Sequence, residues 1–479
     1  MNFIVVMADT LRADHLGCYG NDWIHTPNLD RLAREGTVFD RAYAASYPTI
    51  PNRTDLFTGR YGEPLHPWGP LSTAEIVLPK VMDLNGYVTQ LVCDTPHLIN
   101  QGAGFQTPFR AWWMVRGQQG DGYRTDSAGP DDGSLPDVTS AGGFASARTQ
   151  YMRNMQGRRL ERDYFAPKVM QAAMDWIELN RGCERFFLWI DSFDPHEPWD
   201  PPQHYVDLYD PGCRKGIPPN LSNEKALTAR ERRQVHARYA GEVTMLDHWL
   251  GRLLDRLDVL GLADSTAVTV ISDHGTGLWD HKRMSKSAPF YEEVSRIVWI
   301  MRVPNKGGRM RIRALVQPPD LMPTLLDLAG VEIPDRVQGK SVLPLLDGSK
   351  RANWDAAITG SAPCLQAPTP VTVTTLRWSL VTVPGQRELY DLREDPKQKR
   401  NVVRKHPDMA QMLWSKMLKR FQQIGTPEWI MEAFSTGKEH VSPHVKDESH
   451  QLLAVRKYLM RGLSREAALS RRRHKQAGH

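Results

Sequence analysis

The feature that most constrains the fold is a set of continuous apolar runs that end in aspartate. The runs at residues 3–8 and 266–271 lead to Asp9 and Asp273. Uninterrupted apolar runs are typical of parallel strands that are buried on both faces. The pattern between them is helical in places, most clearly at residues 228–257. Because parallel strands place their carboxyl ends at one edge of a sheet, we expect an α/β fold in which these aspartates meet.

Bulk composition is that of an ordinary globular protein. The chain has 479 residues, 41% of them hydrophobic, and its mean hydropathy is −0.48. No apolar run approaches the ~20 residues that a membrane span needs, so no membrane association is expected. Residues 1–9 lack a basic region and a cleavage site, which favours a first strand over a signal peptide and predicts a cytoplasmic protein. Five scattered cysteines, an odd number, suit a reducing compartment.

The net charge is +6, and its basic excess is strongest near the end of the chain. Residues 470–475 read Ser-Arg-Arg-Arg-His-Lys. A basic balance is one indication of a nucleic-acid partner. No RNA- or DNA-binding motif accompanies this one, so a solvated basic tail is the expected interpretation and no nucleic-acid partner is predicted.

Residues 45–61 carry the most chemical information. Pro51 fits the first position of a helix, where its missing N–H costs nothing. Thr49 would then lie at the mouth of that helix, where free N–H groups and the helix dipole favour an anion. Arg53, about one turn further on, can reach the same place. The segment therefore predicts an anion site that contains a hydroxyl and an arginine.

This segment resembles the sulfatase signature Cys/Ser-x-Pro-Ser-Arg-x-x-x-x-Thr-Gly-Arg of the alkaline phosphatase superfamily. The matching residues are Pro51, Arg53, Thr58, Gly59 and Arg60. Asn52 replaces the motif serine, and Thr49 occupies the nucleophile position. In sulfatases the nucleophile is a formylglycine hydrate made by oxidising cysteine or serine, and threonine cannot give that aldehyde. The resemblance implies direct attack by a metal-bound Thr49, as in related phosphodiesterases and nucleotide pyrophosphatases.

Two further motifs imply a metal site. The stretch that begins at Asp9 looks like the sulfatase opening, whose first aspartate binds metal, although Thr10 replaces the second aspartate of many members. Asp273 and His274, in Ser-Asp-His-Gly, match the second metal pair. The implied ligands are these two residues, Asp9 and the Thr49 oxygen, around one divalent ion. The histidine favours manganese or zinc, and calcium stays open.

The resemblance also implies contacts to the substrate. His97 matches the histidine of a family Lys-Trp-His element, whose lysine is replaced here by Thr95. His196 lies in a stretch similar to Asp-Pro-His-x-Pro and is the expected general acid or leaving-group contact. Lys286 is the expected contact to the transferred group, with Lys282 as the second choice.

The implied fold is alkaline-phosphatase-like, with a mostly parallel sheet flanked by helices and a smaller C-terminal α+β subdomain. That subdomain is expected to combine an antiparallel sheet with one helix at residues 406–424. The expected boundaries are 1–350, 351–427 and 428–479, and the resemblance fades near residue 425. Residues 120–147 read as a long loop, and long loops in compact domains are often lids or substrate-binding elements. The final basic segment, with a helical stretch at 450–463, is expected to support a homo-oligomer.

These features predict a hydrolase for a small anionic ester, a phosphodiester or a phosphonate monoester, with a covalent Thr49 intermediate. A formylglycine hydrate expels sulfate by elimination, whereas a threonine ester must be hydrolysed directly, which is more plausible for phosphate. Two alternatives stay open: a sulfatase that works without formylglycine, and a non-catalytic relative that binds an anion. A second metal held by Asp191, Asp194 and His196 also stays open, although Lys286 would compete for that space.

Overall fold

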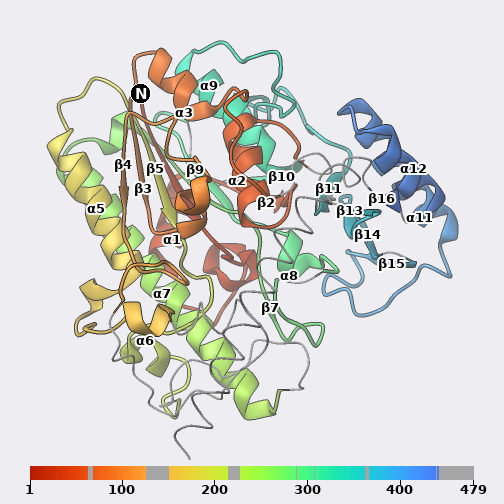
Figure 1. Ribbon diagram of the computed structural model, residues 1–479, viewed down its shortest axis with the longest axis horizontal. Coiled ribbons are helices and arrows are strands. Elements are labelled where there is room, and N and C mark those ends of the chain that lie inside the picture. The colour runs from red at the N-terminus through yellow and green to blue at the C-terminus, as the bar shows by residue number, and fades with distance from the viewer. Residues whose placement is uncertain are drawn as a thin grey trace, which may run out of the picture.

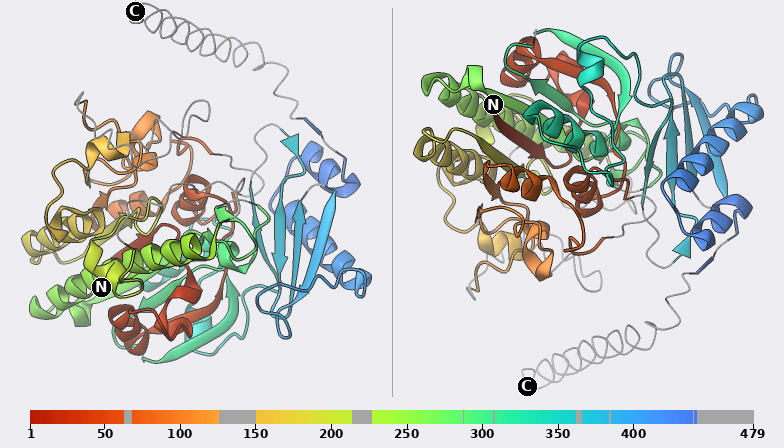
Figure 2. Two further views of the ribbon diagram at one scale, coloured as in Figure 1. Left: turned by 90° about the horizontal axis from the view of Figure 1, so that it is seen from below. Right: turned by 90° about the horizontal axis from the view of Figure 1, so that it is seen from above.

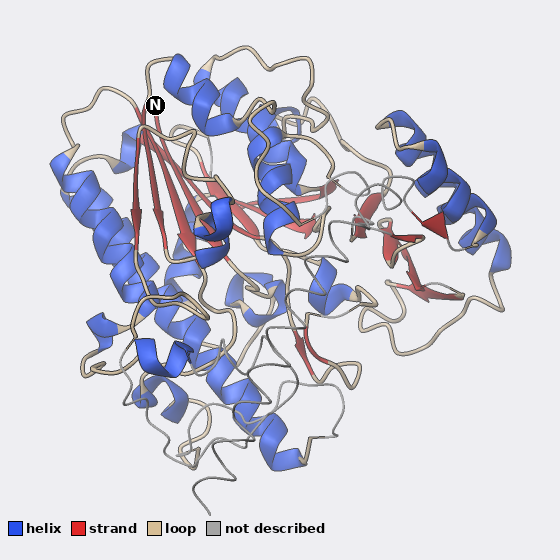
Figure 3. Cartoon of the chain, viewed as in Figure 1, coloured by secondary structure: helices blue, strands red, loops and turns tan. Residues whose placement is uncertain are grey.

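A computed structural model describes residues 1–62, 68–125, 150–213, 227–286, 288–306, 308–361, 366–383, 385–438 and 440–441. Its larger unit is built on an eight-stranded sheet between helices (Figures 1 and 3). In spatial order the strands are β10 (Met310–Val316), β2 (Thr37–Ala42), β9 (Trp299–Arg302), β6 (Thr266–Ser272), β1 (Asn2–Ala8), β5 (Phe186–Ser192), β3 (Val88–Cys93) and β4 (Ala111–Met114).

The central strands confirm the prediction of a mostly parallel sheet. Strand β1 pairs in parallel with β5 on one side and with β6 on the other. Only β9 runs antiparallel to both of its neighbours. All residues of β1, β5 and β6 are buried, as the continuous apolar runs predicted. The ends of these strands therefore share one edge of the sheet.

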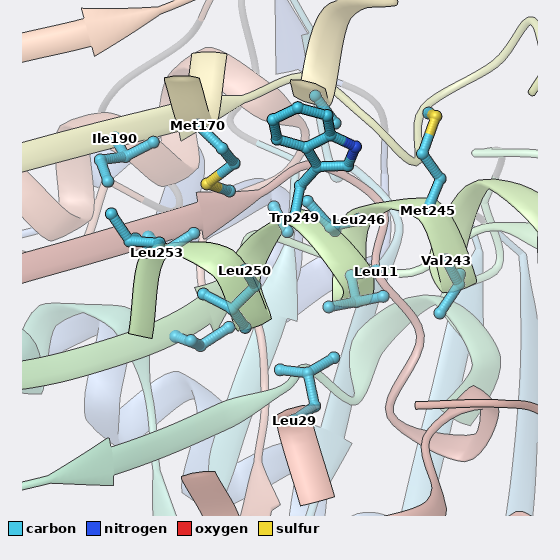
Figure 4. Packing of buried hydrophobic residues seen from close by; sticks show 14 of the residues in the cluster. Leu11, Leu29, Met170, Ile190, Val243, Met245, Leu246, Trp249, Leu250 and Leu253 are labelled. Carbon is cyan, nitrogen blue, oxygen red and sulfur yellow. The ribbon is translucent and has the colours of Figure 1, made fainter. Parts of the chain in front are cut away.

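Alternate residues of β1 point into two separate cores. Ile4 and Val6 belong to the core formed with α1, α5 and α7, whereas Phe3 and Val5 belong to the core formed with α2, α3 and α9. Figure 4 shows the first core, in which α7 residues such as Trp249 pack near α5 and β5. Helices thus cover both faces, which is why the strands carry no polar alternation. These helices are α1 (Pro27–Glu35), α2 (Thr49–Thr58), α3 (Leu78–Leu84), α5 (Phe165–Leu179), α7 (Ala229–Val259) and α9 (Leu321–Ala329).

Shorter elements complete the larger unit. The short α-helices are α6 (Gln203–Asp207), α8 (Glu292–Ser295) and α10 (Leu343–Leu346), and β7 (Gly277–Leu278) pairs with β8 (Met284–Ser285). The 3₁₀ helices are Ala13–His15, Gly17–Tyr19, Pro96–Leu98, Asn100–Gly102, Glu161–Asp163, Ala263–Ser265 and Pro318–Asp320. None of the helices in the described part of the chain has the length and apolar character to cross a membrane.

The C-terminal unit confirms the predicted small antiparallel sheet. Its strands are, in order, β11 (Ala357–Gly360), β13 (Val371–Thr374), β14 (Trp378–Val383) and β15 (Gln386–Asp391). Helices α11 (Pro407–Gln423) and α12 (Glu428–Thr436) lie on one side of this sheet (Figure 2). The same unit also contains a two-stranded ribbon, in which β12 (Gln366–Ala367) pairs with β16 (His440–Val441).

The core of the C-terminal unit continues beyond residue 427, where the sequence placed its end. Ile430, Ala433 and Phe434 of α12 are buried in the same cluster as residues of α11 and the sheet. The expected tail helix at 450–463 and residues 126–147 of the expected long loop lie outside the described residues.

Helix α2 differs in detail from the sequence prediction. It begins at Thr49, so Pro51 is the third residue of the helix and not the first. A proline is still tolerated there, because the first four N–H groups of a helix have no partner within the helix. The earlier start makes Thr49 the first helical residue, and its side chain is almost fully buried.

Candidate active site

The ends of β1 and β6 bring together three of the predicted metal ligands. Asp9, Asp273 and His274 each offer one ligand atom, and these atoms lie within 4.8 Å of one another. All three side chains are excluded from solvent. Their proximity follows from the parallel pairing of β1 with β6, in which Ala8 lies opposite Ser272.

The buried atoms of this group fit a divalent cation. Nδ1 of His274 donates to the carbonyl oxygen of Gly275 at 2.8 Å, so Nε2 presents its lone pair. That Nε2 is buried without a hydrogen-bond partner, as are Thr10 Oγ1 and Asn52 Oδ1. Buried polar atoms are nearly always satisfied in folded proteins. An imidazole fixed through its second nitrogen, beside two carboxylates, is a common arrangement around a metal ion.

Arg53 lies among the carboxylates of the same group. Its Nη1 is 3.0 Å from Asp9 Oδ2 and also contacts Asp273, while its Nη2 is 2.9 Å from Asp191 Oδ1. Burial by itself would raise the pKa of Asp273, but His274 and Arg53 outweigh it and hold that pKa below its usual value. Asp9 is different, because burial and the neighbouring charge of Asp273 raise its pKa well above normal. The guanidinium therefore balances a concentrated negative charge.

The three residues proposed for a second metal do not form a ligand group. Asp191 is bound by Arg53, and Asp194 accepts from Gln118 at 2.9 Å and from the Ala166 N–H at 3.0 Å. Within the described residues, the only close group of histidine, cysteine and acidic side chains is Asp9, Asp273 and His274.

Thr49 lies between residues that contact the group formed by Asp9, Asp273 and His274. Two positions before it, the ring of Tyr47 is 4.7 Å from the ring of His274. Three positions after it, Asn52 donates to the carbonyl oxygen of Asp273 at 2.9 Å. The first turn of α2 is therefore fixed beside the ends of β1 and β6, with Thr49 at the positive end of the helix dipole.

Lys286, and not Lys282, joins the site. Nζ of Lys286 contacts Nε2 of His196, whereas Lys282 is exposed. Nδ1 of His196 donates to the carbonyl oxygen of Glu197 at 2.6 Å, so Nε2 accepts from Lys286. Burial lowers the pKa of His196 to about 3; Glu197 opposes this change and Lys286 adds to it. His196 is thus neutral near pH 7, and its role as general acid stays a prediction.

His97 is connected to this pair through aromatic contacts. Its ring is 5.8 Å from that of Phe193, which stacks on His196 at 3.9 Å. On the other side, the ring of Trp68 is 5.1 Å away. Burial, and then the charge of Lys286, lower the pKa of His97 to about 4. His97 therefore lies close enough to Lys286 for the lysine charge to disfavour protonation of its ring.

Sequence reasoning missed Glu197 of this site, and it named Asp191 only as a candidate ligand of a second metal. Glu197 accepts from Ser285 at 2.8 Å and lies beside His196, so it connects the segment that carries His196 to strand β8. Asp191 holds Arg53 and accepts from Thr95 at 2.6 Å. The signal for Asp191 was present, because it too follows an apolar strand. No sequence signal indicated the contact between Glu197 and Ser285.

Comparisons with known proteins agree with this geometry. The family described as Sulfatase matches residues 1–331, more than half of the chain. The chain belongs to the sulfatase family. A second family, N-sulphoglucosamine sulphohydrolase, C-terminal, matches residues 275–425. The resemblance inferred from the motifs is confirmed, and the protein is a sulfatase-family ester hydrolase.

Individual relatives of this sulfatase-family hydrolase cover most of its length. An arylsulfatase of Clostridium perfringens is 27% identical over 451 residues, which cover 84% of this chain and 90% of the relative. An N-acetylglucosamine-6-O-sulfatase of Bacteroides thetaiotaomicron is 27% identical over 489 residues, covering 86% and 85%. The solved phosphonate monoester hydrolase of Agrobacterium radiobacter has a TM-score of 0.70 at 20% identity, covering 88% and 96%. That structural likeness supports the fold.

Proposed function

We propose that Thr49 is the nucleophile of a metal-dependent hydrolase whose substrates are phosphodiesters or phosphonate monoesters. The observation that carries the proposal is the threonine at the first position of α2, beside the group formed by Asp9, Asp273 and His274. A threonine hydroxyl cannot be oxidised to the formylglycine aldehyde. The remaining way to use this position as a nucleophile is direct attack by its oxygen.

The metal would be held by Asp9, Asp273 and His274, with manganese or zinc favoured by the imidazole ligand. When bound, such an ion lowers the pKa of an adjacent hydroxyl and withdraws charge from the reacting ester. In the proposed reaction Thr49 Oγ forms a bond to phosphorus as the bond to the leaving oxygen breaks. Thr49 gives up its proton to solvent, and the leaving oxygen takes a proton from Lys286. Water then attacks phosphorus as the bond to Thr49 Oγ breaks; the proton that water loses returns to Lys286, and Thr49 takes a proton from solvent.

The charge of the site favours a substrate that carries one negative charge. Thr95 stands where the family motif has a lysine, and its hydroxyl donates to Asp191 at 2.6 Å. Among the residues that the structure describes, Lys286 is the cation that contacts His196. Phosphodiesters and phosphonate monoesters carry one negative charge, whereas phosphate monoesters approach two near neutral pH. The loss of one cation therefore disfavours monoesters most.

Sulfate esters are the second candidate, since curated relatives of this chain include an arylsulfatase and an N-acetylglucosamine-6-O-sulfatase. A sulfated threonine would have to be released by attack of water on sulfur. A formylglycine hydrate avoids that step by elimination, and Thr49 cannot. For this reason the phosphorus esters are preferred.

A hydrolysis screen tests the proposal. Protein supplied in turn with manganese, zinc and calcium is compared on bis-aryl phosphate, aryl phosphonate, aryl phosphate and aryl sulfate. Diester or phosphonate turnover should be lost in Thr49→Ala and kept in part in Thr49→Ser. Acid-quenched wild-type protein should carry phosphorus on the peptide that contains residue 49. Faster turnover of the sulfate ester would overturn the substrate choice, and full activity of Thr49→Ala would overturn the nucleophile.

A further inference from the structure

Lys286 is carried on a short hairpin whose backbone is held in unfavourable conformations. Residues 277–286, here named the Lys286 hairpin, comprise β7, β8 and the turn between them. Trp279, Lys282 and Ser285 have φ values of 79°, 58° and 59°. Side-chain-bearing residues adopt this left-handed region rarely, and they persist there only when the surroundings hold them. External contacts must therefore fix the hairpin.

Two of these contacts come from the larger unit. The buried guanidinium of Arg12 donates to Asp280 at 2.7 Å, and Asp280 in turn accepts from the Leu278 N–H at 3.1 Å. At the other strand, Ser285 donates to Glu197 at 2.8 Å. These bonds fix the base of the turn and the strand end next to Lys286.

His281 makes a third contact, which joins the hairpin to α8 and to the C-terminal unit; Lys399 of the C-terminal unit also donates to the carbonyl oxygen of Asp280. Nδ1 of His281 is 2.5 Å from a carboxylate oxygen of Glu293, and Nε2 is 3.0 Å from the carbonyl oxygen of Gln398. Both neighbours are acceptors, so both ring nitrogens must carry a proton to satisfy them. The ring also stacks on Tyr291, with centroids 3.8 Å apart and planes 13° apart.

The charged groups that face His281 agree with a protonated ring. Burial lowers the pKa of His281, but the hydrogen bond and the charge of Glu293 outweigh it and raise that pKa above 6.5. Lys399 acts against the change from the C-terminal unit. Tyr291, on the stacked face, is uncharged near neutral pH because burial and its bond to Glu388 raise its own pKa. The groups that face the ring therefore favour its imidazolium form.

Gln398 is itself fixed by both units. Its side-chain oxygen accepts from the Glu292 N–H at 2.7 Å, and its side-chain nitrogen donates to Ser379 of β14 at 3.0 Å. Only 1% of the Gln398 surface is exposed. In Figure 1, β7 and α8 lie on the side of the larger unit toward the small sheet. A continuous set of contacts thus runs from the small sheet through Gln398 and His281 to the hairpin.

We propose that His281 is a positioning residue through which the C-terminal unit holds Lys286 against His196. The inference rests on the proposed function in one respect, namely that Lys286 contacts the reacting ester. The C-terminal unit is then part of the working site, although none of its described residues belongs to the group formed by Asp9, Asp273 and His274. A neutral imidazole at position 281 can satisfy only one of the two acceptors. Glutamine carries both of its N–H donors on one nitrogen and not on opposite sides of a ring, so it also loosens the hairpin.

The experiment compares wild type with His281→Gln and Glu293→Gln, and uses His204→Gln as a matched control. His204 also pairs with a glutamate, at 3.3 Å from Glu161, but it lies on α6 and is 60% exposed. Backbone hydrogen exchange across residues 277–291 should be faster in His281→Gln and Glu293→Gln than in wild type. It should be unchanged in the control. This readout needs no substrate.

Kinetics on the ester that wild type hydrolyses give the second readout. His281→Gln should lower kcat on the order of 10- to 100-fold with a smaller change in KM, as a misplaced reacting group does. Wild-type kcat should fall as pH rises through the pKa of His281, and the variant should lack that limb. Unchanged exchange and unchanged kcat in His281→Gln would overturn the proposal; if that variant does not fold, unchanged exchange in Glu293→Gln does so. If wild type hydrolyses no ester but the two variants still show faster hydrogen exchange than wild type, the proposed function is wrong and the contact role of His281 remains.

Discussion

Nη2 of Arg53 lies 2.9 Å from Oδ1 of Asp191, and neither side chain is exposed to solvent. Thr95 and the indole of Trp189 also donate to Asp191, at 2.6 and 3.2 Å. The strand-end aspartates therefore have two different roles. Asp9 belongs with the group that fits a cation, whereas Asp191 fixes the arginine that faces that group.

The first prediction concerns this buried ion pair. Asp191→Asn should lower the free energy of unfolding by about 1–3 kcal/mol, because Arg53 keeps Asp9 and Asp273 as partners, while the NH₂ group of asparagine faces buried donors that Asp191 accepts from. Urea denaturation measures the loss. The control is Asp255→Asn, whose partner Arg31 is 2.7 Å away at a site where the Asp255 side chain is 62% exposed. The control should lose no more than about 1 kcal/mol. Equal losses in both variants would contradict the role given to burial.

The second prediction concerns the metal. Manganese or zinc at 100 times its dissociation constant should raise the free energy of unfolding by about 2.7 kcal/mol, since it binds the folded state. The increase should vanish in Asp273→Asn and after chelation, and it should persist in Asp258→Asn, a change on the exposed side of α7. Thermal unfolding with and without the ion measures it. A stabilisation that survives Asp273→Asn would place the ion elsewhere.

The sequence predicted those parts of the site that strand order brings together. Asp9 and Asp273 are 264 residues apart, yet both follow apolar strands, so a parallel sheet had to bring them near each other. His281 could not be found in this way. Its two acceptors, Glu293 of α8 and the Gln398 carbonyl of the C-terminal unit, meet it only in the tertiary fold, and no periodicity of the sequence encodes that proximity. The pairing of Arg53 with Asp191 was missed as well, although Asp191 follows an apolar strand.

The third prediction concerns acid stability. The pKa of His97 is about 4 in the folded protein, below the 6.5 of an unfolded chain. The unfolded state therefore binds more protons between these values, and folding stability should fall as pH drops from 6.5 to 4. His97→Gln should show a shallower decline in urea titrations across this range. His25→Gln, a change at an exposed histidine, should leave the slope unaltered. An identical slope in all three proteins would show that His97 does not titrate in this range.

The fourth prediction concerns Asp55, a residue of α2 that helps to hold Thr49 in position. Asp55 is fully buried and accepts from the Ser46 N–H at 2.7 Å, the Ser46 hydroxyl at 2.8 Å and the Gly62 N–H at 2.7 Å. Asp55→Ala removes the acceptor of these three hydrogen bonds, and each buried group that is left unsatisfied costs about 1–3 kcal/mol. Asp22→Ala, at an exposed aspartate, should be near neutral.

Because Ser46 precedes and Gly62 follows α2, the Asp55 carboxylate closes the two ends of the helix segment onto each other. Its loss should therefore reduce turnover as well as stability, since Thr49 is the first residue of the helix. Asp55→Asn should fall between wild type and Asp55→Ala, because its amide oxygen can accept while its NH₂ group faces donors. Urea denaturation and kcat are measured on the same samples. Lost turnover with unchanged stability in Asp55→Ala would mean that Asp55 acts on the reaction itself and not on the position of α2.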